Sequence, residues 1–213
     1  SDRGVKTGSG SYVLEPAHIG AYTMVVGSHK SNPDTSDFPF SYLIEKQGES
    51  YLLPAQNLKT MGLFRDEVKW HRRDLRIESI ARDLFTTEVF NPLTIGKMIK
   101  AVNKADEMIA SATGDTILVN GVRIQKGLLV RARNAYNEVA QAFVLESYLK
   151  SQEYEGAPTE WTDCGGLIVP KDQMEALESN LAQGLYHSVA DIAKAFEVRE
   201  RQLRGESAAV EHE

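Results

Sequence analysis

His29 has the surroundings most suggestive of catalysis in this sequence. Imidazole is the usual general base for removing a proton from a hydroxyl or an amine near neutral pH. A loop rich in hydrogen-bonding side chains follows it, with Asn32, Asp34, Thr35 and Ser36. This arrangement would suit an acyltransferase-like base, with Asp34 orienting the ring and Asn32 contacting a ligand. In the competing interpretation, these polar residues cap a tight loop, which is their usual role in turns.

A second cluster lies in the charged run from Arg65 to Arg76. Arg72, Arg73 and Arg76 would act as bidentate donors to a phosphate, and Trp70 would stack on a base or a sugar. Acidic residues are interleaved with the arginines, and they favour ion pairs at three- and four-residue spacing on a helix surface instead. The sequence leaves both interpretations open.

The other reactive residue types form no recognisable site. Cys164 is the only cysteine, so the chain has no internal disulfide and no cysteine-based zinc site. Asp163-Cys164-Gly165-Gly166 lacks the Lys-Ser/Thr pair and the glycine spacing of a phosphate-binding loop. The five histidines are scattered. We therefore predict no metal site, and the sequence identifies no cofactor.

Composition restricts the partners. The chain has 213 residues, of which 42% are hydrophobic and 25% charged, as expected for a folded globular protein. Its formal net charge is −6, so no overall basic field attracts nucleic acid or an anionic membrane. No apolar run is long enough to span a bilayer. We expect a cytoplasmic protein that binds neither nucleic acid nor membrane.

The elements that would position His29 show a six-residue period. An aliphatic residue recurs at Val13, Ile19 and Val25. This period fits neither a helix nor a plain alternating strand. It is typical of a left-handed parallel β-helix, in which each coil has three flat sides and one aliphatic residue per side points inward. The alternative is an ordinary edge hairpin. A coil buries its faces only against neighbouring coils, so we expect missing coils N-terminal to Ser1 or an oligomer partner.

The remainder reads as a β-hairpin followed by helices. Turn residues at 47–49 separate two short strands, 41–45 and 50–53. A short strand or an extended connection, with a turn at Asn120-Gly121, is expected over 117–124. Helices are predicted over residues 63–84, 92–112, 128–150 and 170–181, and Asn91-Pro92 is the start signal of the second. The fold class is thus α+β, mainly α. We divide the chain into a terminal β-helix coil, loop and hairpin (1–53), a helical region (54–150), a linker (151–162) and a C-terminal helical region (163–213).

Several stretches together resemble a known group of proteins. They are Gly20-Ala-Tyr-Thr-Met24, His29, Asn32-Pro-Asp-Thr-Ser36, Pro39-Phe-Ser-Tyr-Leu43, Pro54-Ala55, Asn57-Leu58, Arg65-Asp66, Lys69-Trp70 and Arg73-Asp74. The group comprises large, uncharacterised bacterial proteins of the Bacteroidetes and spirochaete type. Their N-terminal left-handed β-helix is similar to that of hexapeptide-repeat sugar acyl- and nucleotidyltransferases, and a helical region follows it. The resemblance implies that this chain is the C-terminal part of such a protein.

Two functional hypotheses follow. In the first, the parent protein is a transferase that acts on a sugar or sugar nucleotide, with His29 as base, Asn32 and Asp34 as polar contacts, and the arginines as phosphate contacts. The use of a coil histidine as the base is an analogy at the level of the fold. In the second hypothesis, the helical region is a non-catalytic module that caps the β-helix and mediates assembly.

Overall fold

The structure is a computed structural model that describes residues 1–75, 87–150, 160–188, 190–192 and 194. Its strands are β1 (Lys6–Thr7), β2 (Tyr12–Val13), β3 (Met24–Val26), β4 (Ser28–His29), β5 (Tyr42–Lys46), β6 (Glu49–Leu53), β7 (Thr116–Val119), β8 (Val122–Gln125), β9 (Trp161–Cys164) and β10 (Leu167–Pro170). Its helices are the 3-10 helix η1 (Gln56–Lys59), α1 (Met61–Arg73), α2 (Pro92–Ser111), α3 (Lys126–Lys150) and α4 (Lys171–Ala182). The fold is α+β, with more residues in helices than in strands.

The N-terminal strands stack in parallel at a constant interval. Lys6 of β1 pairs with Met24 of β3, and Met24 pairs with Tyr42 of β5, so that eighteen residues separate each pair. The chain therefore passes the same side of the molecule once every eighteen residues, which is three times the six-residue period of the sequence. Inward-facing Val25 and Leu43 are adjacent in this register and fully buried.

One turn of the chain repeats with the same interval. Gly4, Tyr22 and Phe40 lie eighteen residues apart, and each has a positive φ, at 69°, 54° and 55°. The Tyr22 and Phe40 rings stack with centroids 4.9 Å apart. A side chain at position 4 would collide with the Tyr22 ring, so glycine is required there both by its conformation and by this close approach.

A second parallel ladder lies on another side of the coils. β2 pairs with β4, which places Val13 beside His29, and an isolated bridge pairs His18 with Asp34. Gly20 passes so close to the carbonyl of Thr35 that a Cβ there would collide with it. The Gly20 amide donates to the Thr35 hydroxyl at 2.9 Å.

The parallel stack ends at a hairpin. β5 and β6 pair in antiparallel fashion around Gln47 and Gly48, which confirms the hairpin predicted there. β6 then pairs in parallel with β8, and β8 pairs with β7 across the Asn120-Gly121 turn. The result is a six-stranded sheet in the order β1-β3-β5-β6-β8-β7.

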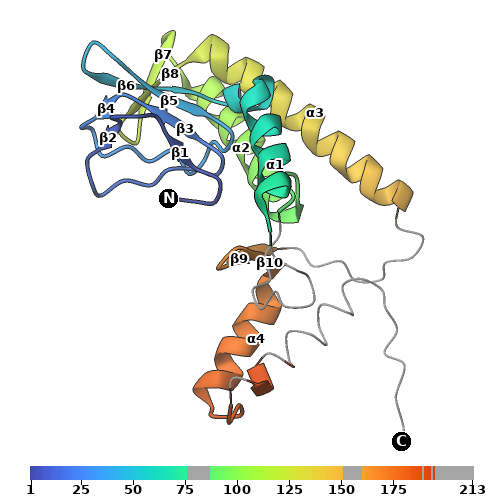
Figure 1. Cartoon of the computed structure of the whole chain (residues 1–213). Helices are drawn as coiled ribbons and strands as arrows, with labels where there is room; N and C mark the ends of the chain where they lie inside the picture. Colours follow the sequence, from blue (N-terminus) through green and yellow to red (C-terminus); the bar gives the residue numbers. More distant parts are fainter. Residues whose placement is uncertain (76–86, 151–159, 189, 193, 195–213) are drawn as a thin grey trace, which may run out of the picture.

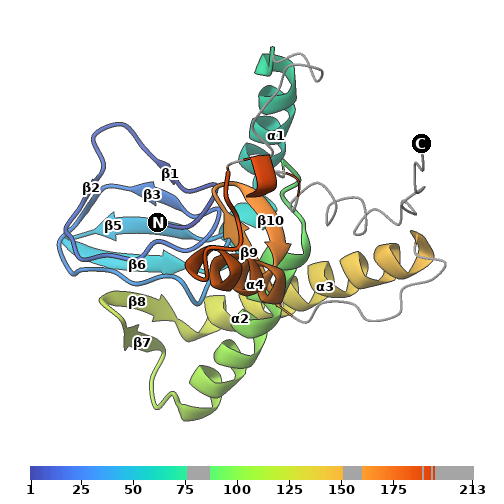
Figure 2. The same ribbon diagram turned by 90° about the horizontal axis from the view of Figure 1, so that it is seen from below.

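Helices α2 and α3 pack against each other and against the strands (Figure 1). Helix α2 begins at Asn91-Pro92, as the sequence predicted, and Asn91 also forms a capping box with Thr94. Residues of α2, α3, β8 and the N-terminal coils belong to a single cluster of buried apolar side chains. Helix α1 projects away from α2 and α3 (Figure 2), and its Met61 and Phe64 are exposed.

A smaller unit follows residues 151–159, which lie outside the described part. β9 and β10 form an antiparallel hairpin with a Gly165-Gly166 turn, and α4 follows directly. This observation corrects the sequence-based description, since Trp161 and Thr162 were assigned to a linker and 163–170 to a helical region. Two glycines with positive φ stop a helix and suit a tight strand turn. In the part of the chain described here, no helix is both long enough and apolar enough to cross a membrane.

Candidate functional site

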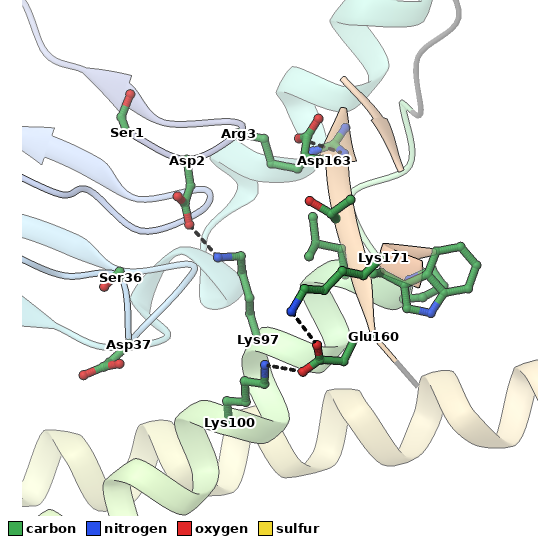
Figure 3. Close-up of a pocket in the computed structure, with 15 residues that line it drawn as sticks. Ser1, Asp2, Arg3, Ser36, Asp37, Lys97, Lys100, Glu160, Asp163 and Lys171 are labelled. Carbon is green, nitrogen blue, oxygen red and sulfur yellow. Dashed lines mark hydrogen bonds and ion pairs between the residues drawn. The ribbon is translucent and has the colours of Figure 1, made fainter. Parts of the chain in front are cut away.

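A cavity of about 710 Å3 opens between the first residues of the chain, the start of α2 and the β9–β10 hairpin (Figure 3). The side chains that give it charge come from these three segments, from the loop before β5 and from the start of α4; they are Asp2, Arg3, Asp37, Lys97, Lys100, Glu160, Asp163 and Lys171. Trp161, which is half-buried, also lines it. The volume lies in the range of small-molecule sites. The cavity thus brings four cationic and four acidic side chains around one space.

Asp2 and Lys97 form the contact on the coil side of the cavity. The Lys97 ammonium donates to Asp2 Oδ2 at 2.7 Å, and His18 Nε2 lies 3.0 Å from Asp2 Oδ1. Burial raises the pKa of Asp2, but the hydrogen bonds and charges of Lys97 and His18 outweigh it, so the pKa of this carboxyl is lowered overall. Asp2 is therefore ionised at neutral pH and holds the first coil against α2.

Glu160 bridges two lysines on the opposite side. Its Oε2 accepts from Lys171 Nζ at 3.0 Å, and its Oε1 lies 3.6 Å from Lys100 Nζ. The hydrogen bond and charge of Lys171, followed by the charge of Lys100, lower the pKa of Glu160. Half of the Glu160 side chain is exposed (51%), and Lys100 is 79% exposed, so water reaches this bridge.

Arg3 and Asp163 make a third contact across the cavity. Arg3 Nη1 lies 3.5 Å from Asp163 Oδ2. Asp163 also orders the β9–β10 turn, because its Oδ1 accepts from the Gly166 amide at 2.6 Å. The hairpin is thus held to the first coil by an ion pair whose acidic partner is fixed by the turn itself.

His29 lies elsewhere, inside the stack of coils. Its side chain is fully buried, and it occupies the inward position beside Val13 that the six-residue pattern would give to an aliphatic residue. The Val26 carbonyl, which can only accept, lies 3.2 Å from Nε2, so Nε2 carries the proton. Nδ1 then accepts from the Ser50 hydroxyl at 2.9 Å, and Ser31 donates to Ser50. Burial lowers the pKa of His29, which favours this neutral form.

The other two residues of the predicted catalytic loop also have local partners. Asp34 Oδ1 accepts from the amide and the hydroxyl of Ser36, at 3.0 Å and 2.6 Å. Asn32 has φ 49° and donates to the Leu14 carbonyl at 3.4 Å. The Asn120 carbonyl accepts from the Asp34 amide, so the β7–β8 turn packs onto this loop. Asp34 therefore does not orient the His29 ring, whose two nitrogens have other partners.

The charged run from Arg65 to Arg73 lies on α1. Trp70, Arg72 and Arg73 are exposed there, and none of them lines the cavity. Arg76 lies outside the described residues. Asp66 of the same run forms an ion pair with Lys6 of β1. The structure therefore brings neither the His29 loop nor this run together with the cavity.

The residues of the cavity carry no sequence signal that we could have used. Lys97 and Lys100 share one face of α2 because they are three residues apart, but such spacing is common on exposed helices. Arg3 is far in the sequence from Glu160 and Lys171, and the three residues form no motif. The β9–β10 pairing places Glu160 beside Lys171, and the packing of this hairpin against α2 and the first coil adds Lys100 and Arg3.

Among the described residues, no group of three or more His, Cys, Asp or Glu side chains is arranged to hold a metal ion.

The comparisons with known proteins place the chain in a family. Residues 1–109, which include the parallel strands and nearly all of α2, match the family described as "Domain of unknown function (DUF4954)". The chain belongs to this DUF4954 family. No curated protein and no solved structure matches it.

Proposed function

We propose that residues 1–53 comprise the last coils of a left-handed parallel β-helix, up to β5, and the hairpin strand β6 that closes their edge, and that the helical region which follows is a non-catalytic module capping them. The observation that carries this proposal is the eighteen-residue interval of the parallel pairs from Lys6 through Met24 to Tyr42. An interval of three hexads corresponds to one complete three-sided coil.

The repeated turn supports the same proposal. Gly4, Tyr22 and Phe40 adopt a left-handed conformation once per interval, as expected if each marks the same corner of successive coils. Backbone bonds join neighbouring levels there, since Tyr22 donates to the Arg3 carbonyl and Phe40 donates to the Ala21 carbonyl. An ordinary edge hairpin has no reason to repeat a turn at this spacing.

Capping is supported by how α3 meets the last coil. Tyr136 is fully buried; its hydroxyl donates to the Pro39 carbonyl and accepts from the Ala55 amide at 3.0 Å. Phe40, between these two backbone groups in the chain, is also fully buried in the shared core. One helix side chain thus satisfies two backbone groups, one on each side of the β5–β6 hairpin, that would otherwise be buried without partners.

A β-helix needs such a module because its last coil has an open apolar end and an unpaired strand edge. Here the antiparallel strand β6 covers the edge of β5, and α2 and α3 supply apolar residues to the core. At the other end of the sheet, β1 has β3 as its one neighbour among the described strands. The proposal assigns that edge to a preceding coil, or to an oligomer partner.

The structure of the native gene product, solved at its natural length, tests this proposal. We expect a strand about eighteen residues before Lys6 to pair in parallel with β1 on the side away from β3. An antiparallel strand or a helix of the same chain on that edge, or coils of the opposite hand, would contradict it. The hypothesis of a transferase for sugars or sugar nucleotides stays a prediction for the parent protein, and the burial of His29 does not favour this residue as its base.

A further inference from the structure

We infer that the cavity between α2 and the β9–β10 hairpin binds a phosphorylated small molecule, whose phosphate takes the place of the Glu160 carboxylate between Lys100 and Lys171. This inference is independent of the capping proposal, because Lys100, Glu160 and Lys171, which would exchange contacts with the phosphate, lie outside residues 1–53.

The arrangement of charge around Glu160 is the first argument. Its two oxygens are shared between two ammonium groups, at 3.0 Å and 3.6 Å, which is the geometry of an anion held by a pair of lysines. A carboxylate brings one negative charge to two positive ones. A phosphate monoester carries about −1.5 to −2 near pH 7, so it matches the lysine pair more closely.

The weakness of the existing contacts is the second argument. Lys100 is 79% exposed, and Glu160 and Lys171 are each 51% exposed. Exposed ion pairs contribute little net stability, because the charges are well solvated when apart. A ligand phosphate therefore displaces Glu160 without uncovering a buried charge, and the carboxylate can turn into solvent.

The rest of the cavity provides room and further contacts. Its volume of about 710 Å3 exceeds what a phosphate ion alone would fill. Lys97 lies one turn before Lys100 on the same side of α2, and its ammonium points into the space toward Asp2 (Figure 3). Half-buried Trp161 offers an apolar surface at the lining. A sugar-sized group attached to the phosphate fits this combination of polar and aromatic side chains.

Titration calorimetry at constant ionic strength tests the inference on the full chain, with inorganic phosphate, a hexose 6-phosphate and the unphosphorylated hexose as probes. We expect the hexose phosphate to bind more tightly than inorganic phosphate. Replacing Glu160→Gln removes the competing carboxylate, so both anions should bind about threefold to tenfold more tightly. The double variant Lys100→Gln, Lys171→Gln should weaken binding at least about tenfold.

Lys46→Gln is the matched control, because Lys46 is an exposed lysine of the β5–β6 hairpin that does not line the cavity. The Lys46→Gln variant should bind inorganic phosphate and hexose 6-phosphate with the affinities of the unmodified chain. Unchanged thermal unfolding of each variant shows that folding is intact. The inference is overturned if neither the unmodified chain nor Glu160→Gln binds phosphate at millimolar concentration, or if the lysine double variant binds as well as the unmodified chain. Equal affinity for inorganic and hexose phosphate would overturn the assignment to a phosphorylated small molecule.

Discussion

The contact of α2 and α3 with the coils differs in its chemistry from the contact of α2 with the β9–β10 hairpin. Toward the coils, these helices contribute buried apolar side chains to a shared core, and Tyr136 adds two buried hydrogen bonds. Toward the β9–β10 hairpin, α2 faces ion pairs around a solvent-accessible cavity. The buried apolar residues of the smaller unit, such as Ile168 and Leu177, lie outside the main cluster.

The difference shows where this molecule is rigid and where it can adjust. Apolar burial contributes about 25 cal/mol per Å2, whereas an exposed ion pair contributes about 0–1 kcal/mol. The coils and the two helices should therefore unfold together. The β9–β10 unit should be the less stable part, and its contacts can be exchanged for those of a ligand.

The largest expected effect comes from Tyr136→Ala. This change removes a fully buried aromatic ring from the joint between α3 and the coils, so the free energy of unfolding should fall by about 3–5 kcal/mol. Chemical denaturation measures this loss. Leu145→Ala, on the exposed part of the same helix, should change stability by less than about 0.5 kcal/mol. Similar losses in the two variants would contradict the proposed joint.

Gly20→Ala should cause the next largest loss in the free energy of unfolding. A methyl group at position 20 would collide with the Thr35 carbonyl of the neighbouring coil, and relieving that overlap should cost about 1–3 kcal/mol. Gly114→Ala is the control, since space is open around Gly114 and its φ is not positive. Denaturation midpoints compare the two, and a neutral Gly20→Ala would argue against close stacking of the coils.

Stability should also depend on the protonation of His29. Because burial lowers its pKa in the folded state, the unfolded chain binds a proton more readily. Neutral His29 therefore contributes to the free energy of unfolding above the pKa of the unfolded chain, about 6.5. This contribution is lost as the pH falls toward the lower pKa of the folded chain, by at most about 1.4 kcal/mol per pH unit. Unfolding free energies at pH 7.5 and 5.0 should therefore differ less in His29→Asn than in the unmodified chain. An unchanged difference would mean that another group causes it.

The smallest change in global stability is expected for a substitution at the cavity. Lys100→Gln removes one exposed ion pair, so global stability should change by less than about 0.5 kcal/mol. Hydrogen exchange of the β9–β10 amides should nevertheless become faster, and added salt should reduce the difference from the unmodified chain. Slower exchange in the variant would contradict the view that ion pairs hold this hairpin in place.

Elements with strong local signals could be predicted from the sequence. Asn91 and Pro92 fixed the start of α2, and the turn formers at 47–49 located the β5–β6 hairpin. The inward position of His29 could not be predicted, because four residues rather than six separate it from Val25, and the pattern alone does not show such a shortened side. The cavity could not be predicted either, since Glu160 meets Lys100 only through tertiary packing.

Native-state hydrogen exchange, read residue by residue, tests most directly whether coils and helices form one unit. We expect that amides of β3, β5, α2 and the buried half of α3 share one free energy of opening, and that β9–β10 amides open at a lower one. Tyr136→Ala should lower protection in the coils and in the helices by the same amount. If the coil amides kept their full protection while α3 lost its own, the helices would not be a cap on which the coils depend.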